Sequence, residues 1–213
     1  MKLYYFPGSC ALAPHIVLEW LGADFEAIRI EKGDPEYLKI NPLGVVPALD
    51  NGNRVLTQAD AILHYLADTH PQAELAGHGS ADAAYDVNYW MAFLTGDLHP
   101  AWFPFFNPQR FNTLADKEAL NNTKAASQIL ITKFYSHLDR HLDGRIFIAG
   151  GKATIADAYA IPMLRWGRLL HGGLGPHTAL EAYIKHWESD GGVQRAMIEQ
   201  SLMSPKKMQP KAQ

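Results

Sequence analysis

The pattern of residues along this 213-residue chain changes once, between His70 and Ser80. Before that stretch, runs typical of β-strands alternate with runs typical of helices, whereas after it strand signals nearly vanish. The change predicts a mixed α/β domain over residues 1–76 and an all-helical domain over residues 82–203. Residues 204–213 carry two prolines and three lysines, and they are predicted to form a flexible tail.

The first domain has a definite order of elements. Strands are predicted at residues 3–6, 25–30, 45–49 and 54–57, and helices at residues 11–21, 35–40 and 58–68. A strand–helix–strand opening needs a crossover and therefore a parallel pair of strands. The tetrapeptide D-N-G-N at 50–53 is a strong hairpin signal, so the last two strands are antiparallel. Together these features predict a small mixed sheet with helices on its faces.

The second domain shows helical patterns. Helices are predicted at residues 81–98, 116–142, 155–170, 178–189 and 193–202. Pro100 is expected to kink or end the first of them. The tetrapeptide T-I-A-D at 154–157 resembles a capping box, with Asp157 in the position usually held by glutamate or glutamine.

Composition argues against several classes of protein. The net charge is −3, so the strongly basic footprint of a nucleic-acid-binding protein is absent. The single cysteine, Cys10, cannot close an internal disulfide, which excludes a disulfide-framed secreted domain. No apolar run approaches the roughly 20 residues of a membrane span, and the N-terminus does not resemble a signal peptide. We therefore expect a cytoplasmic protein that binds neither nucleic acid nor membrane.

Cys10 is the most informative single position. It lies between a predicted strand and the first turn of a predicted helix, where free backbone N–H groups and the helix dipole favour anions. These would lower the pKa of the thiol and favour the reactive thiolate. The alternative is a small buried hydrophobic residue, which is common for a free cysteine. Placement alone leaves both interpretations open.

Two other segments could hold a peptide-like ligand. A cis bond at Val46-Pro47 would leave the Val46 backbone free to pair with such a ligand, although an X–Pro bond taken alone is more often trans. Gln58 and Ala59 open a predicted helix whose free N–H groups could hold a carboxylate. An ordinary helix start explains these two residues equally well.

Three histidines are candidates for chemistry. His99 stands where Pro100 interrupts a predicted helix, so it could face a cleft and act as an acid, a base or a hydrogen-bond donor. A structural or surface role is the more frequent one for a single histidine. His137 and His141 have a metal-compatible spacing, but the glutamate of the zinc-protease motif and a third ligand are missing. We therefore expect no metal.

Aromatic side chains are candidates for an acceptor pocket. Trp102 and Phe106 belong to a strongly apolar run, W-F-P-F-F. Either a pocket wall or plain core packing accounts for them. Tyr159 and Trp166 carry the same two interpretations.

Five segments, in the right order and spacing, resemble those of the cytosolic glutathione S-transferases, most closely the bacterial beta class. They are M-K-L-Y-Y…P-G-S-C-A-L-A…H at 1–15, N-P-L-G-V-V-P-A-L at 41–49, L-T-Q-A-D-A-I…Y-L-A-D at 56–68, D-L-H at 97–99 and T-I-A-D-A-Y at 154–159. The resemblance covers nearly the whole chain. It implies a thioredoxin-like N-terminal domain followed by a helical-bundle C-terminal domain, glutathione as co-substrate, and a homodimer.

The resemblance also implies roles for individual residues. Cys10 would lie at the glutathione sulfur, His99 would hydrogen-bond near it, and the Val46-Pro47 bond would be cis. The implied glutathione-binding residues are Tyr5, Lys32, Val46, Pro47, Gln58 and Ala59. The implied acceptor pocket between the domains contains Trp102, Phe106, Tyr159 and Trp166. The chain departs from the family pattern at Ala11, Ala59, Ala92 and Pro100.

Three functions are compatible with these features. The first is a detoxifying transferase that conjugates the thiolate of glutathione to small hydrophobic electrophiles. The second is a glutathione-dependent thiol–disulfide oxidoreductase or peroxidase that uses Cys10 through a mixed disulfide. The third is a non-enzymatic binding protein on the same fold, which the substitutions at Ala59, Ala92 and Pro100 leave open.

Overall fold

The computed structural model describes residues 1–77, 79–114 and 116–204. Its strands are β1 (Lys2–Tyr5), β2 (Glu26–Arg29), β3 (Ala48–Asp50) and β4 (Val55–Thr57). They form one sheet in the order β2-β1-β3-β4. β1 pairs with β2 in parallel, whereas the β1–β3 and β3–β4 pairs are antiparallel. This is the small mixed sheet predicted from the sequence.

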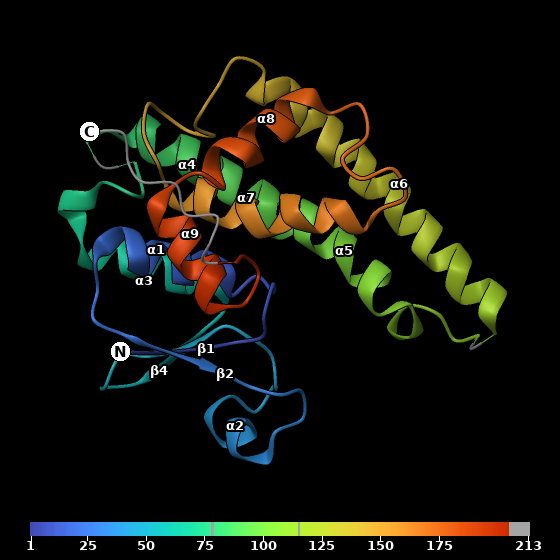
Figure 1. The fold of residues 1–213 in the computed structure, drawn as a ribbon, viewed down its shortest axis with the longest axis horizontal. Coiled ribbons are helices and arrows are strands. Elements are labelled where there is room, and N and C mark those ends of the chain that lie inside the picture. The colour runs from blue at the N-terminus through green and yellow to red at the C-terminus, as the bar shows by residue number, and fades with distance from the viewer. Residues whose placement is uncertain (78, 115, 205–213) are drawn as a thin grey trace.

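The helices of the first domain follow from local signals. α1 (Leu12–Leu21) ends at Gly22, whose φ of 59° is left-handed and suits glycine. α2 (Pro35–Ile40) begins where the Asp34 side chain accepts the backbone N–H of Glu36. α3 (Ala59–Thr69) follows β4 directly. Figure 1 shows α1 and α3 between the sheet and the remaining helices, with α2 on the other side of the sheet.

The second domain contains helices and connecting loops, with no strand among its described residues. Its helices are α4 (Ala81–Phe93), α5 (His99–Phe106), α6 (Lys117–Leu142), α7 (Ile155–Trp166), α8 (Thr178–Trp187) and α9 (Gly191–Glu199). A thioredoxin-like domain followed by a helical domain confirms the predicted fold class. No helix within the described ranges is both long and apolar enough to span a membrane. Of the predicted tail, residues 205–213 lie outside the described residues.

The segment around His99 differs from the prediction. Instead of one helix over residues 81–98 that Pro100 ends, α4 leads through a π-helical turn, Leu94–Leu98, into α5. Pro100 is the second residue of α5, where a missing backbone N–H and a fixed φ are both tolerated. The apolar run that follows His99 is therefore a helix, which the sequence analysis had not assigned.

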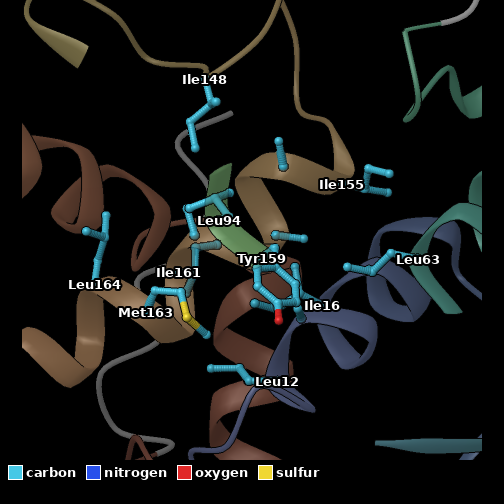
Figure 2. Close-up of a cluster of buried hydrophobic side chains, with 14 of the residues drawn as sticks. Leu12, Ile16, Leu63, Leu94, Ile148, Ile155, Tyr159, Ile161, Met163 and Leu164 are labelled. Atoms are coloured by element: carbon cyan, nitrogen blue, oxygen red, sulfur yellow. The ribbon is translucent and has the colours of Figure 1, made fainter. Parts of the chain in front are cut away.

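The main core is built around α7. Every residue from Ile155 to Leu164 is buried, because other elements cover this helix on all sides. Figure 2 shows Leu12 and Ile16 of α1 and Leu63 of α3 around Tyr159. A single apolar cluster thus joins the two domains. The capping box is present: the backbone N–H and hydroxyl of Thr154 donate to one oxygen of Asp157, at 2.8 and 2.9 Å.

Candidate functional site

A cavity of about 840 Å³ lies between the two domains. On one side it is lined by the loop after β1, including Cys10, and by the segment 43–46 before β3. On the other side it is lined by α5, by the turn that follows it, and by the end of α7. Apolar surface with a few convergent polar groups is typical of a small-molecule site.

Cys10 lies two residues before α1 and lines this cavity. Its Sγ donates a hydrogen bond to the carbonyl of Val46 at 3.5 Å. Burial of the sulfur raises the pKa of the thiol to about 12, and only the backbone N–H of Cys10 itself acts in the opposite direction. Of the two interpretations that placement left open, this direction favours the buried, protonated cysteine in the free protein.

The reason lies at the start of α1. The N–H of Ala11 donates to Ser9 Oγ at 3.3 Å, and the N–H of Leu12 donates to the Ser9 carbonyl at 3.0 Å. The N–H of Ala13 donates to the Cys10 carbonyl at 3.0 Å. These donors are already used, so they are not free to stabilise a thiolate, and desolvation of the sulfur dominates.

His99 lines the same cavity as Cys10. Its Nδ1 lies 2.6 Å from the hydroxyl of Tyr159, and its ring packs on Trp166 with centroids 5.2 Å apart. Burial lowers the pKa of His99 to about 4. At neutral pH the imidazole is therefore uncharged, and it can offer Nε2 as a donor or an acceptor depending on its tautomer.

The Val46–Pro47 bond is cis, as the resemblance implied. Val46 lines the cavity and Pro47 is buried beside it. The β3–β4 register pairs Ala48 with Thr57, so the next residues outward, Pro47 and Gln58, are neighbours across the hairpin. Gln58 is exposed and has a positive φ of 69° where it precedes α3. The start of α3 therefore lies across the hairpin from Pro47, although neither Gln58 nor Ala59 lines the cavity.

The acceptor side of the cavity differs in part from the expectation. Phe106 and Trp166 line it, as does Phe103, which the sequence analysis did not single out. Trp102 does not, because its ring faces inward from α5 and is fully buried. Tyr159 is also buried, and it reaches the cavity only through His99.

The structure places some of the predicted glutathione-binding residues on the cavity and others away from it. Lys32 is exposed and lines the cavity. Tyr5 does not line it, because its ring is buried against His15 and its hydroxyl donates to the Glu199 carbonyl at 3.4 Å. The position of Tyr5 therefore lends no support to its predicted role in glutathione binding.

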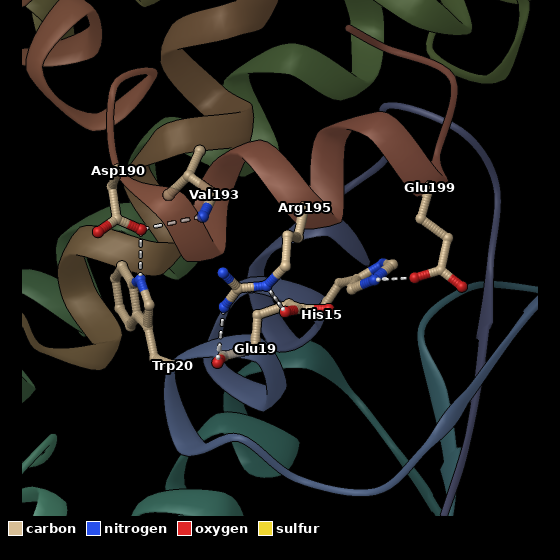
Figure 3. Close-up of polar contacts among 7 residues, drawn as sticks. All are labelled: His15, Glu19, Trp20, Asp190, Val193, Arg195 and Glu199. Carbon is tan, nitrogen blue, oxygen red and sulfur yellow. Dashed lines mark hydrogen bonds and ion pairs between the residues drawn. The ribbon is translucent and has the colours of Figure 1, made fainter. Parts of the chain in front are cut away.

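The C-terminal residues near the cavity were missed by sequence reasoning. Leu202 lines the cavity, and the buried Gln200 accepts a hydrogen bond from the backbone N–H of Gly8. α9 is held against α1 by the polar contacts that Figure 3 shows, including Trp20 with Asp190. No local motif marks these residues, since their partners are about 170 or more residues away.

The fold and the cavity define a class of protein: a two-domain, thioredoxin-like protein with one thiol and one neutral histidine at a ligand cavity. Two family models match the chain, the N-terminal domain of glutathione S-transferase at residues 1–68 and the C-terminal domain at residues 121–186. A curated relative, glutathione S-transferase GST-4.5 of Xanthomonas campestris pv. campestris, is 37% identical over 205 residues, covering 95% of this chain and all of the relative.

Solved structures agree with the sequence comparison. The glutathione S-transferase from Xylella fastidiosa has a TM-score of 0.88 at 36% identity, covering 95% of this chain and 99% of its own. A beta-class enzyme from Sphingomonas chungbukensis has a TM-score of 0.81 at 32% identity, covering 95% of this chain and all of its own. A sphingomonad transferase complexed with glutathione has a TM-score of 0.81 at 34% identity, with the same two coverages. The chain belongs to the glutathione S-transferase family.

Proposed function

We propose that this protein conjugates the thiolate of glutathione to small hydrophobic electrophiles in the cavity between its domains. The observation that carries the proposal is the placement of Cys10 and His99 on one cavity whose other wall is aromatic. Such a cavity can hold a thiol and an electrophile together, and holding both reactants is a large part of catalysis for a two-substrate reaction. The thiolate sulfur attacks the electrophilic carbon, the leaving group departs with its electron pair, and the thiol proton passes to solvent.

The N-terminal side of the cavity is the proposed glutathione site. The backbone of Val46 would pair with the cysteinyl part of glutathione, next to the buried Pro47. Gln58 and the N–H of Ala59 would hold the γ-glutamyl end, one residue beyond the β3–β4 ladder. Lys32 would lie near the glycyl carboxylate. The binding of glutathione by a related sphingomonad transferase supports this arrangement.

We propose that Cys10 acts toward the glutathione sulfur as a hydrogen-bond donor. In the free protein it already donates to a carbonyl, and its raised pKa keeps the proton on the sulfur at neutral pH. A neutral S–H group next to a glutathione thiolate stabilises that anion without competing with it as a nucleophile. His99, uncharged and on the same cavity, would supply a second polar contact near the reacting atoms.

Glutathione-dependent disulfide exchange is the second candidate. It is supported by the position of Cys10, the one thiol of the sequence, on the cavity. The exchange would proceed through a mixed disulfide with glutathione, resolved by a second glutathione. It requires a thiolate, which the raised pKa of Cys10 opposes.

Replacement of Cys10 by alanine and by serine distinguishes these functions. Reduced protein is titrated with reduced glutathione by calorimetry, and turnover is measured with 1-chloro-2,4-dinitrobenzene and with hydroxyethyl disulfide. We expect micromolar to low-millimolar glutathione binding and conjugation that survives in Cys10→Ala at a reduced rate. Conjugation abolished in both variants, with glutathione binding intact, would contradict the donor role. Absence of glutathione binding by the unmodified protein would favour a non-enzymatic binding protein.

We also propose that the protein is a homodimer located in the cytoplasm, as the family resemblance implies. Sedimentation at micromolar protein tests the first part, and a monomeric mass would contradict it. Fractionation of cells that express the untagged chain tests the second.

A further inference from the structure

The cavity carries positive charge without a carboxylate to balance it. Lys32, Arg110 and Arg165 line it, and no aspartate or glutamate within the described residues does. The whole chain, in contrast, is acidic, with 22 acidic residues against 19 lysines and arginines. The cationic lining is therefore a local property of this cavity rather than a consequence of composition.

The three cations differ in what else they contact. Arg165 shares the carboxylate of Glu188 with Arg168, so its charge is largely balanced by this group outside the cavity. Lys32 lies on the N-terminal side, where the glycyl carboxylate of glutathione is proposed to bind. Arg110 stands on the opposite side, in the turn Pro108–Arg110 after α5. None of the ion pairs among the described residues includes its side chain.

Arg110 follows the aromatic wall of the cavity. Phe103 and Phe106 precede it on α5, with 42% and 41% of their surfaces exposed, and Asn107 lies between them and the turn. An apolar, aromatic wall that leads to a guanidinium and a carboxamide fits a ligand with an aromatic body and an anionic end. A guanidinium can bind a carboxylate with two parallel hydrogen bonds, which fixes orientation as well as charge.

We propose that the acceptor side of this cavity selects electrophiles that carry a carboxylate, with Arg110 as the residue that binds it. The proposal rests on the proposed transferase function and specifies its substrate class. In the reaction the glutathione sulfur forms a bond to the electrophilic carbon, and the carbon–halogen bond breaks with loss of halide. The carboxylate takes no part in this exchange and only positions the carbon that is attacked.

A matched pair of acceptors tests the proposal. 4-Chloro-3,5-dinitrobenzoate and its methyl ester differ in charge at a position remote from the reacting carbon. Each kcat/KM is divided by the rate constant of the uncatalysed reaction with glutathione, because the two compounds differ in intrinsic reactivity. We expect a rate enhancement about five- to tenfold larger for the benzoate, and loss of this preference in Arg110→Gln with the ester unaffected. Arg145→Gln, an equal charge change at an exposed residue away from the cavity, should keep the preference.

Binding of unreactive analogues separates this proposal from the transferase function. 3,5-Dinitrobenzoate and its methyl ester are titrated into the protein with quenching of tryptophan fluorescence as the signal. If the protein binds the anion more tightly than the ester, and Arg110→Gln abolishes this difference, the acceptor site is supported. A failure to turn over any acceptor would then contradict only the transferase function. Equal affinity for both analogues, or a raised KM for glutathione in Arg110→Gln with no change in preference, would overturn the proposal.

Discussion

Gln200 accepts a hydrogen bond of 3.1 Å from the backbone N–H of Gly8, in the loop that lines the ligand cavity. The other end of the same side chain, Nε2, donates to Nδ1 of His15 at 3.1 Å. His15 therefore carries its proton on Nε2, which donates to the Glu199 carboxylate at 3.1 Å (Figure 3). One buried amide thus connects the C-terminal segment, the cavity loop and α1.

We expect Gln200→Ala to impair both stability and glutathione binding. The substitution leaves the Gly8 N–H and His15 Nδ1 without their partners, and Gln200 is only 1% exposed. The loss should lower the free energy of unfolding by about 2–3 kcal/mol. Because the loop that contains Gly8 also carries Cys10, the KM for glutathione should rise several-fold. The KM for 1-chloro-2,4-dinitrobenzene should change less. Urea unfolding and steady-state kinetics measure the two effects.

Gln194→Ala is the matched control. Gln194 is buried on α9, but its amide donates to the Glu188 carbonyl, and among the described residues it makes no hydrogen bond to the cavity loop. It should lose stability without a change in the KM for glutathione. If both variants raise the KM for glutathione equally, loss of the hydrogen bond between Gln200 and Gly8 is not the cause of the increase.

The Cys10 thiol should react slowly at neutral pH in the free protein. Its pKa is raised to about 12 by burial, so the thiolate fraction grows about tenfold per pH unit across the accessible range. We expect the rate of alkylation by iodoacetamide to rise from pH 7 to pH 10 without a plateau. The measurement is specific because the sequence has one cysteine. A plateau below pH 8 would show instead that the helix start stabilises the thiolate.

His99 should stay uncharged throughout the physiological range. Burial lowers its pKa to about 4, below the ordinary value of 6.5. Protonation is therefore disfavoured in the folded state, and the corresponding stability is present above pH 6.5 and lost as the pH falls toward 4. The ring proton signals of His99, assigned by comparison with His99→Asn, should titrate near pH 4 in an NMR experiment. A midpoint near 6.5 would mean that water reaches the ring freely.

Tyr159→Phe should act only through His99. The hydroxyl of Tyr159 lies 2.6 Å from Nδ1 of His99 and is the polar contact that orients this ring. Its removal should cost about 1 kcal/mol of stability and lower kcat/KM about three- to tenfold. In a His99→Asn background the same substitution should have little further effect on kcat/KM. A fully additive loss would disprove that Tyr159 acts through His99.

Sequence patterns predicted the sheet and the boundaries of α1 because both depend on local signals. The D-N-G-N turn sets the β3–β4 hairpin, and Gly22 ends α1 in a left-handed conformation. α5 was missed because Pro100 and Pro104 both argue locally against a helix. The direction in which Trp102 points follows from that helix, so its burial could not be assigned before α5 was known.

For the candidate site, too, sequence predicted the features that depend on local signals and missed those that depend on distant residues. Cys10 and His99 were identified as candidates from their neighbours in sequence, and the cavity brings them together. Sequence left two interpretations of Cys10 open because the helix start is a local feature, whereas burial of the sulfur, which raises its pKa, depends on distant residues such as Val46. The contact of Gln200 with Gly8 spans 192 positions, and no motif in either segment indicates it.

Asp157 makes the stability of the helical domain depend on pH. Its carboxyl is fully buried and receives hydrogen bonds from Ile148, Tyr183 and Thr154. Burial nevertheless raises its pKa to about 6, from 3.8, because desolvation outweighs these four bonds. A raised pKa means that the folded state binds the proton more tightly than the unfolded state does. This contribution to stability is complete below pH 3.8 and is lost as the pH rises through 6.

Asp157→Asn removes this titration while it keeps an oxygen that can accept from Thr154 or Ile148. The wild-type protein should therefore gain about 2 kcal/mol relative to the variant when the pH falls from 7.5 to 4.5. Urea unfolding of both proteins at the two pH values measures the difference, and groups that titrate elsewhere cancel in the comparison. If the wild-type protein instead loses stability relative to the variant as the pH falls, the four donors, rather than burial, determine the pKa of Asp157. The buried carboxylate would then be ionised across this range.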